Sequence, residues 1–94
     1  MTNDNCMFVG TKPFMNYVTG VVMQFTAKGA ADVVIKARGK FIYRAVDIAE
    51  VVRKRFLQDQ VDVKDIKIDS EEFTNNEGKV VRVSTIEITL AKKK

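Results

Sequence analysis

The chain has no histidine, and its 94 residues include one cysteine and one proline. Without histidine, a Ser-His-Asp triad, a Cys-His pair and the usual zinc sites are excluded. The single cysteine, Cys6, cannot form an intramolecular disulfide, which fits a reducing cytoplasm. Neither GxGxxG nor GxxxxGK(S/T) occurs, so nothing in the sequence supports a nucleotide cofactor. These absences favour a binding protein over an enzyme, without a metal or a cofactor.

Long apolar runs are also missing. None approaches the roughly 18 residues that a membrane span needs, so we expect no membrane partner. The N-terminal stretch MTNDNCMFVG carries Asp4 where a secretory signal would carry positive charge. We therefore expect one cytoplasmic domain over residues 1–94, with residues 1–6 and 92–94 disordered.

The charges are segregated along the chain, whose formal net charge is +4. The stretch VVIKARGKFIYRAVD holds Lys36, Arg38, Lys40 and Arg44 with no acidic residue before Asp47. Residues 59–77 instead carry seven acidic residues against two lysines. A basic cluster is a cost to the folded chain unless something negative binds it, which favours a polyanion partner.

Hydrophobic spacing predicts the first half of the fold. A short strand is expected at residues 7–10, followed by a helix that starts near Pro13 and stops near Gly29. The apolar face of this helix comprises Phe14, Val18, Val21, Val22 and Phe25. In the next strand, ADVVIKA, strict alternation places Lys36 and Arg38 on the face opposite Val33, Ile35 and Ala37.

The second half predicts a helix and a hairpin. Residues 40–57 carry a helical stripe of Ile42, Ala45, Ala49, Val52 and Phe56. Two long strands follow, and each shows a one-residue slip, near residues 64–65 and 84–85, which indicates a bulge or a change of buried face. Asn75, Asn76 and Gly78 close them as a hairpin. The predicted class is α+β, a two-layer β-α-β-α-β-β chain with two helices on one four-stranded mixed sheet and a protruding β-hairpin arm.

Several functions compete for the charged residues. The basic cluster is either a solvated edge or a surface for a nucleic-acid backbone. A metal-dependent nuclease would use carboxylates among Asp62, Asp65, Asp69, Glu71 and Glu72, but their spacing on a strand is unhelpful. A scaffold that binds proteins through the acidic hairpin would leave the basic cluster unused. An RNA-binding subunit of a ribonucleoprotein fits the same cations, because A-form and B-form backbones both suit a cationic surface.

The segments VGTKPFMNYV, VVIKARGKFIYRAVDIAEVVRKRFL and RVSTIEITLAKK resemble the Alba family of archaeal nucleic-acid-binding chromatin proteins. The resemblance covers roughly residues 8–93, with the motifs in the family's order. It implies a non-enzymatic homodimer that binds double-stranded DNA and RNA with little sequence preference. Such dimers assemble further on DNA, condense it and stay with the chromosome.

The resemblance also implies site residues. The expected nucleic-acid contacts are Lys12, Asn16, Tyr17, Lys36, Arg38, Lys40, Arg44, Lys79 and Arg82, and Phe56 is the expected contact between neighbouring dimers. For Tyr17 and Phe56 a place in the core is the competing interpretation. Two departures matter: Thr11 replaces a lysine that relatives acetylate, so that regulation does not carry over, and the outgoing arm strand is acidic, which opposes phosphates.

Overall fold

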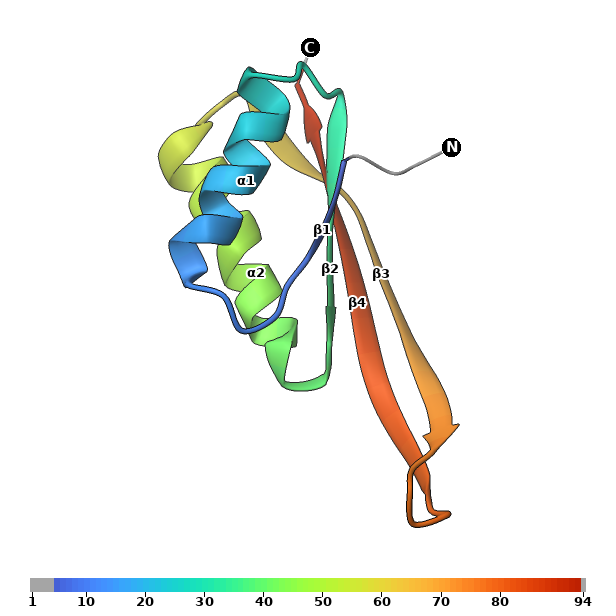
Figure 1. Ribbon diagram of the computed structural model, residues 1–94. Coiled ribbons are helices and arrows are strands. Elements are labelled where there is room, and N and C mark those ends of the chain that lie inside the picture. The colour runs from blue at the N-terminus through green and yellow to red at the C-terminus, as the bar shows by residue number, and fades with distance from the viewer. Residues whose placement is uncertain (1–4, 94) are drawn as a thin grey trace.

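A computed structural model describes residues 5–93, and its elements alternate as the sequence predicts (Figure 1). They are β1 (Cys6–Phe8), α1 (Phe14–Thr26), β2 (Asp32–Arg38), the 3-10 turn η1 (Gly39–Phe41), α2 (Ile42–Val51), the π-helical turn η2 (Val52–Phe56), β3 (Val61–Thr74) and β4 (Val80–Lys92). The first strand therefore lies slightly earlier than residues 7–10, and the second helix is divided into three pieces.

The four strands form one mixed sheet in the order β1-β2-β4-β3. β1 runs parallel to β2, whereas β2 and β3 both pair antiparallel with β4. Both helices cover the same face of this sheet (Figure 1), α1 over β1 and β2, and α2 over β2 and β4. The other face of the sheet, which we call the open face, carries no helix. The α+β prediction is confirmed.

The core lies between the helices and the sheet, as the spacing predicts. Alternation in β2 buries Val33, Ile35 and Ala37, and α1 buries Val18, Val21 and Phe25. Tyr17 is also buried, whereas Phe14 packs only at the margin of the core. The fully buried larger side chains are Ile35, Ile48, Leu90, Val18, Val21, Val33 and Val52.

The π-helical turn η2 explains why Phe56 is not in the core. In an α-helix the residue one turn after Val52 is Phe56, but in η2 the Leu57 amide donates to the Val52 carbonyl at 2.8 Å, five residues back. Leu57 therefore takes the buried position, and Phe56 is 48% exposed. The core interpretation of Phe56 is wrong for this chain, and its predicted role between dimers stays a prediction.

The two predicted slips in β3 and β4 have different causes. The register of β3 shifts between Val63 and Asp65, which is the predicted bulge. In β4 the register is continuous through Ser84 and Thr85. The apolar residues there change face, because β2 stops pairing at Arg38, opposite Thr85.

Beyond that point β3 and β4 pair only with each other, over residues 70–84, which we call the arm. Figure 1 shows the arm extending well past the helices. At its tip, the Asn75 side chain accepts hydrogen bonds from the amides of Glu77 at 2.9 Å and Lys79 at 3.0 Å. Gly78 adopts φ 79°, a left-handed conformation that glycine tolerates. The predicted turn is confirmed.

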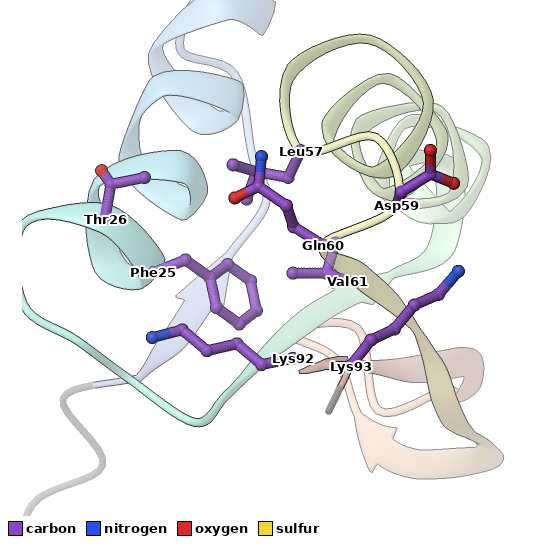
Figure 2. Close-up of a pocket in the computed structure, with 8 residues that line it drawn as sticks. All are labelled: Phe25, Thr26, Leu57, Asp59, Gln60, Val61, Lys92 and Lys93. Atoms are coloured by element: carbon purple, nitrogen blue, oxygen red, sulfur yellow. The ribbon is translucent and has the colours of Figure 1, made fainter.

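The ends of the chain are more ordered than predicted. Cys6 lies in β1 and Lys92 in β4, so the expectation of disorder is wrong for these residues, while residues 1–4 and 94 lie outside the described part. The Lys93 amide donates to the Gln60 carbonyl at 2.8 Å. Lys92 and Lys93 there line a hollow of about 660 Å³ beside Phe25 (Figure 2).

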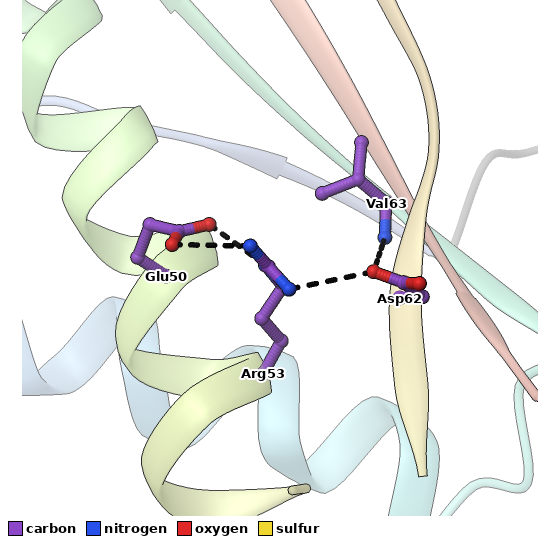
Figure 3. A network of polar contacts seen from close by, with 4 residues as sticks. All are labelled: Glu50, Arg53, Asp62 and Val63. Atoms are coloured by element: carbon purple, nitrogen blue, oxygen red, sulfur yellow. Dashed lines mark hydrogen bonds and ion pairs between the residues drawn. The ribbon is translucent and has the colours of Figure 1, made fainter. Parts of the chain in front are cut away.

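Arg53 ties the end of the second helix to β3 (Figure 3). Its guanidinium donates to both carboxylate oxygens of Glu50, at 2.7 and 3.2 Å, and lies 3.4 Å from Asp62. The hydrogen bonds to Glu50 raise the pKa of Arg53, so this link stays charged across the physiological range. The Asp62 carboxylate also accepts from the Val63 amide at 2.9 Å, just before the bulge.

Candidate nucleic-acid interface

The predicted basic residues come from three separate segments that meet at one end of the body. Lys12 lies in the loop between β1 and α1, Arg38 and Lys40 lie at the β2–η1 junction, and the arm leaves the body at the same end (Figure 1). Gly39 makes this junction possible, because it adopts φ 55° between the two cations. The fold therefore brings together charges that are more than twenty residues apart in the sequence.

Tyr17 holds the loop that carries Lys12. Its hydroxyl accepts hydrogen bonds from the amides of Gly10 at 2.9 Å and Lys12 at 3.1 Å, and the side chain is only 5% exposed. Among the described residues, no side chain caps α1. Tyr17 is thus placed to position this loop, and its direct contact with nucleic acid stays a prediction.

Arg44 clamps the same loop from α2. Its guanidinium donates to the carbonyls of Gly10 and Lys12 and lies 5.6 Å from the centre of the Tyr17 ring. These hydrogen bonds to the loop occupy one nitrogen of the Arg44 guanidinium. Its positive charge still adds to the electrostatic potential at Lys12. This contact fixes Lys12 beside the start of α2.

Lys36 lies on the open face, where the sequence places it. Its ammonium is 3.9 Å from the Glu87 carboxylate on β4 and 5.5 Å from the centre of the Phe8 ring on β1. Phe8 and Glu87 both pair directly with Lys36 across neighbouring strands. The sequence analysis did not predict either neighbour. The strand at MFVG was too short for its two faces to be assigned, and placing Glu87 beside Lys36 requires the register between β2 and β4.

The arm supplies acidic partners for two arginines. Arg38 lies 3.2 Å from Glu71, and Arg82 donates through two nitrogens to Glu72. All four side chains are more than half exposed. Exposed pairs of this kind contribute about 0–1 kcal/mol, so a phosphate can replace the carboxylate at small cost. The acidic run in the arm therefore pairs with the predicted cations.

The remaining predicted residues are exposed to solvent. Lys12 and Asn16 line a hollow of about 310 Å³ together with Phe8 and Tyr17. Lys40 is exposed, with its ammonium 5.6 Å from the Phe41 ring. Lys79 lies at the exposed tip of the arm, farther from the other cations along β4.

The acidic residues of the nuclease alternative are engaged elsewhere. Asp62, Glu71 and Glu72 each face an arginine. Across residues 5–93, His, Cys, Asp and Glu side chains form no group of three that could hold a metal ion. Nor does this part of the chain contain a helix both long and apolar enough to cross a membrane.

Comparison with known proteins gives consistent matches. A family model described as Alba matches residues 5–70. The DNA/RNA-binding protein Alba of Nanoarchaeum equitans is 64% identical over 88 residues, which cover 93% of this chain and 97% of that protein. The DNA/RNA-binding protein Alba 1 of Archaeoglobus fulgidus is 60% identical over 90 residues, covering 96% and 98%. The solved structure of Alba from Thermoplasma volcanium matches with TM-score 0.84 at 47% identity, covering 93% of this chain and 99% of that one.

Proposed function

The chain belongs to the Alba family, and from that premise we propose that it binds the phosphate backbone of double-stranded DNA, and of RNA, without chemical action on either. Two relatives more than half identical over nearly the whole chain are named DNA/RNA-binding proteins. Backbone contacts would position the protein without reading bases, which accounts for binding to both kinds of duplex.

One observation carries the proposal: the β1–α1 loop, which carries Lys12, meets the β2–η1 stretch, which carries Lys36, Arg38 and Lys40, at one end of the body. Within residues 5–93 their acidic neighbours hold them weakly, through the exposed Arg38–Glu71 pair and the 3.9 Å contact between Lys36 and Glu87. Phosphates compete effectively for such cations, and each contact releases condensed counterions from the duplex.

We further propose that the protein acts as a homodimer. Ile66 and Ile68 on β3 pair with Ile88 and Ile86 of the core, so they project on the helix-covered side of the sheet. The helices pack against the start of β3 but leave Ile66 and Ile68 uncovered, and these two side chains are 57% and 76% exposed. A second copy would cover this apolar strip and double the number of cations facing a duplex.

The dimers would then coat or compact nucleic acid in the cytoplasm, in association with the chromosome. Phe56, exposed at the end of η2, is available for contact between neighbouring dimers. Lys79 and the arm would reach along the duplex beyond the body.

A binding titration tests the proposal. Fluorescence anisotropy of labelled duplex DNA and of a matched RNA duplex is measured with the wild type and with Arg38→Glu. We expect an affinity loss of about tenfold or more for both duplexes in the variant, because charge reversal removes a phosphate contact and repels the backbone. Lys28→Glu is the control. It makes the same charge change just after α1, at the opposite end of the body, and should lose far less affinity. Equal losses in both variants, or none in Arg38→Glu, would contradict the proposal.

A further inference from the structure

Phe8 is an exposed aromatic side chain in the middle of the basic surface. It ends β1, at the edge of the sheet, and 71% of its surface is exposed. Its strand partner is Lys36, so it projects from the open face, away from the helices. A ring this exposed contributes little to the core, and the Lys36 ammonium lies 5.5 Å from its centre.

Two hollows adjoin this ring. One, of about 310 Å³, also contains Lys12 and Asn16. The other, of about 190 Å³, contains Lys36, Arg38, Glu71 and Glu87. Phe8 thus lies between two small hollows, each of which is lined by at least one cationic side chain.

We propose that Phe8 is a stacking platform for an unpaired nucleobase of a single-stranded RNA or DNA segment. This inference rests on the proposed function and adds a second binding mode to the same surface. An unpaired base stacks on an exposed aromatic ring while nearby cations hold its flanking phosphates. Lys12 on one side and Lys36 and Arg38 on the other suit phosphates on either side of the stacked base.

The acidic side chains beside Phe8 determine which part of a nucleotide fits the smaller hollow. The carboxylates of Glu71 and Glu87 repel a phosphate there, but they accept hydrogen bonds from the amino groups of a base. The base therefore enters this hollow beside Glu71 and Glu87, and its flanking phosphates lie toward Lys12 and the exposed side chain of Arg38.

A duplex does not use this site, because its bases are already paired and stacked. Phe8 therefore affects the affinity for single strands and leaves the affinity for blunt duplexes nearly unchanged. This difference separates a stacking platform from one more part of the backbone-binding surface.

The test compares Phe8→Leu with the wild type on a short single-stranded RNA, the matching single-stranded DNA and a blunt duplex. We expect about five- to a hundredfold weaker binding to single strands, the range of one lost base stack, with duplex affinity changed less than about twofold. The two single strands show whether RNA or DNA is the better source of the base. Thermal melting of both proteins shows that the exposed substitution leaves the fold intact.

A second variant reports stacking directly. The chain contains no tryptophan, so Phe8→Trp introduces one fluorophore at the site. We expect near wild-type affinity for single strands and strong quenching of the emission on binding. Met23→Trp, at an exposed position of α1, is the control and should be quenched much less.

The outcomes separate this inference from the proposed function. If the wild type binds the duplex but Phe8→Leu binds single strands equally well, the stacking platform is overturned and the proposed function stands. If Phe8→Leu weakens duplex and single strand alike, Phe8 belongs to the general surface and the inference is also wrong. If the wild type binds neither nucleic acid, both proposals fail.

Discussion

Arg38 and Glu71 face each other across the base of the arm at 3.2 Å, and both remain largely solvated. A carboxylate in this place occupies the guanidinium in much the same way as a phosphate oxygen would. Glu71 lowers the positive potential around Arg38, and under the proposed function it would compete with nucleic acid for this side chain. The same reasoning applies to Glu72, which holds Arg82 farther along the arm.

Removing the charge of Glu71 should strengthen binding. We expect Glu71→Gln to raise duplex affinity about two- to fivefold at moderate salt, since it frees Arg38 and removes repulsion with phosphates. Anisotropy titrations measure the change. Asp59→Asn is the control. It makes the same charge change just before β3, at the opposite end of this strand from Glu71, and asparagine tolerates the φ of 64° that Asp59 adopts. An unchanged or weaker affinity in Glu71→Gln would refute the competition.

The environment of Tyr17 could not be predicted from the sequence. The family resemblance implies a nucleic-acid contact for Tyr17 and the helical spacing left a core position open; in the structure its hydroxyl accepts from two loop amides and the side chain is buried. Nothing in a helical pattern reveals which loop folds back over a tyrosine. The basic residues were easier to place, because alternation in β2 fixes Lys36 and Arg38 on one face whatever surrounds them.

At the scale of elements, regular hydrophobic periodicity predicts the buried positions well, but it does not reveal local irregularities such as a π-helical turn or a bulge. The 3.6-residue spacing of α1 and the alternation of β2 place Val18, Val21, Val33 and Ile35 correctly in the core. The π-helical turn after Val52 adds one residue to the turn, so the stripe moves from Phe56 to Leu57. The register of the arm, which sets Glu71 beside Arg38, depends on a bulge and on long-range pairing.

The tip of the arm depends on one side chain. We expect Asn75→Ala to speed amide hydrogen exchange in residues 73–82, because two accepted hydrogen bonds, each contributing about 1 kcal/mol, are lost in a segment that pairs only with itself. Exchange in β2 should not change. Asn76→Ala is the control, since the Asn76 side chain makes no hydrogen bond to other described residues. Exchange followed by mass spectrometry compares them, and uniform protection in all three proteins would contradict this account of the arm.

The molecule is elongated, and both of its helices lie on the same face of the sheet. Its extents are 48 by 27 by 21 Å, and the long dimension comes from the arm. The helices cover β1, β2 and β4 on one face but leave the edge strand β3 exposed at Ile66 and Ile68. A monomer of this shape would carry an exposed edge and an apolar strip together, a combination that association with a second copy relieves.

Disrupting that strip should separate the dimer. We expect Ile68→Asp to shift the mass in solution from twice 10.6 kDa toward 10.6 kDa, because a buried charge at the interface has no partner. Size-exclusion chromatography with light scattering measures the mass. Met23→Asp, at an exposed methionine of α1, is the control and should remain dimeric. A wild type that is monomeric, or an Ile68→Asp variant that stays dimeric, would show that β3 is not the interface.

The central claim is that this surface binds nucleic acid through phosphates, and the salt dependence of duplex affinity tests it most directly. A dimer presents Lys12, Lys36, Arg38, Lys40 and Arg44 twice, and about half of these ten cations would contact phosphates together, which predicts a slope of log affinity against log salt of about −4 to −6. In Arg38→Glu the slope should become shallower by about 2, one unit for each lost contact. A slope near zero in the wild type, or an identical slope in the variant, would contradict backbone binding by this surface.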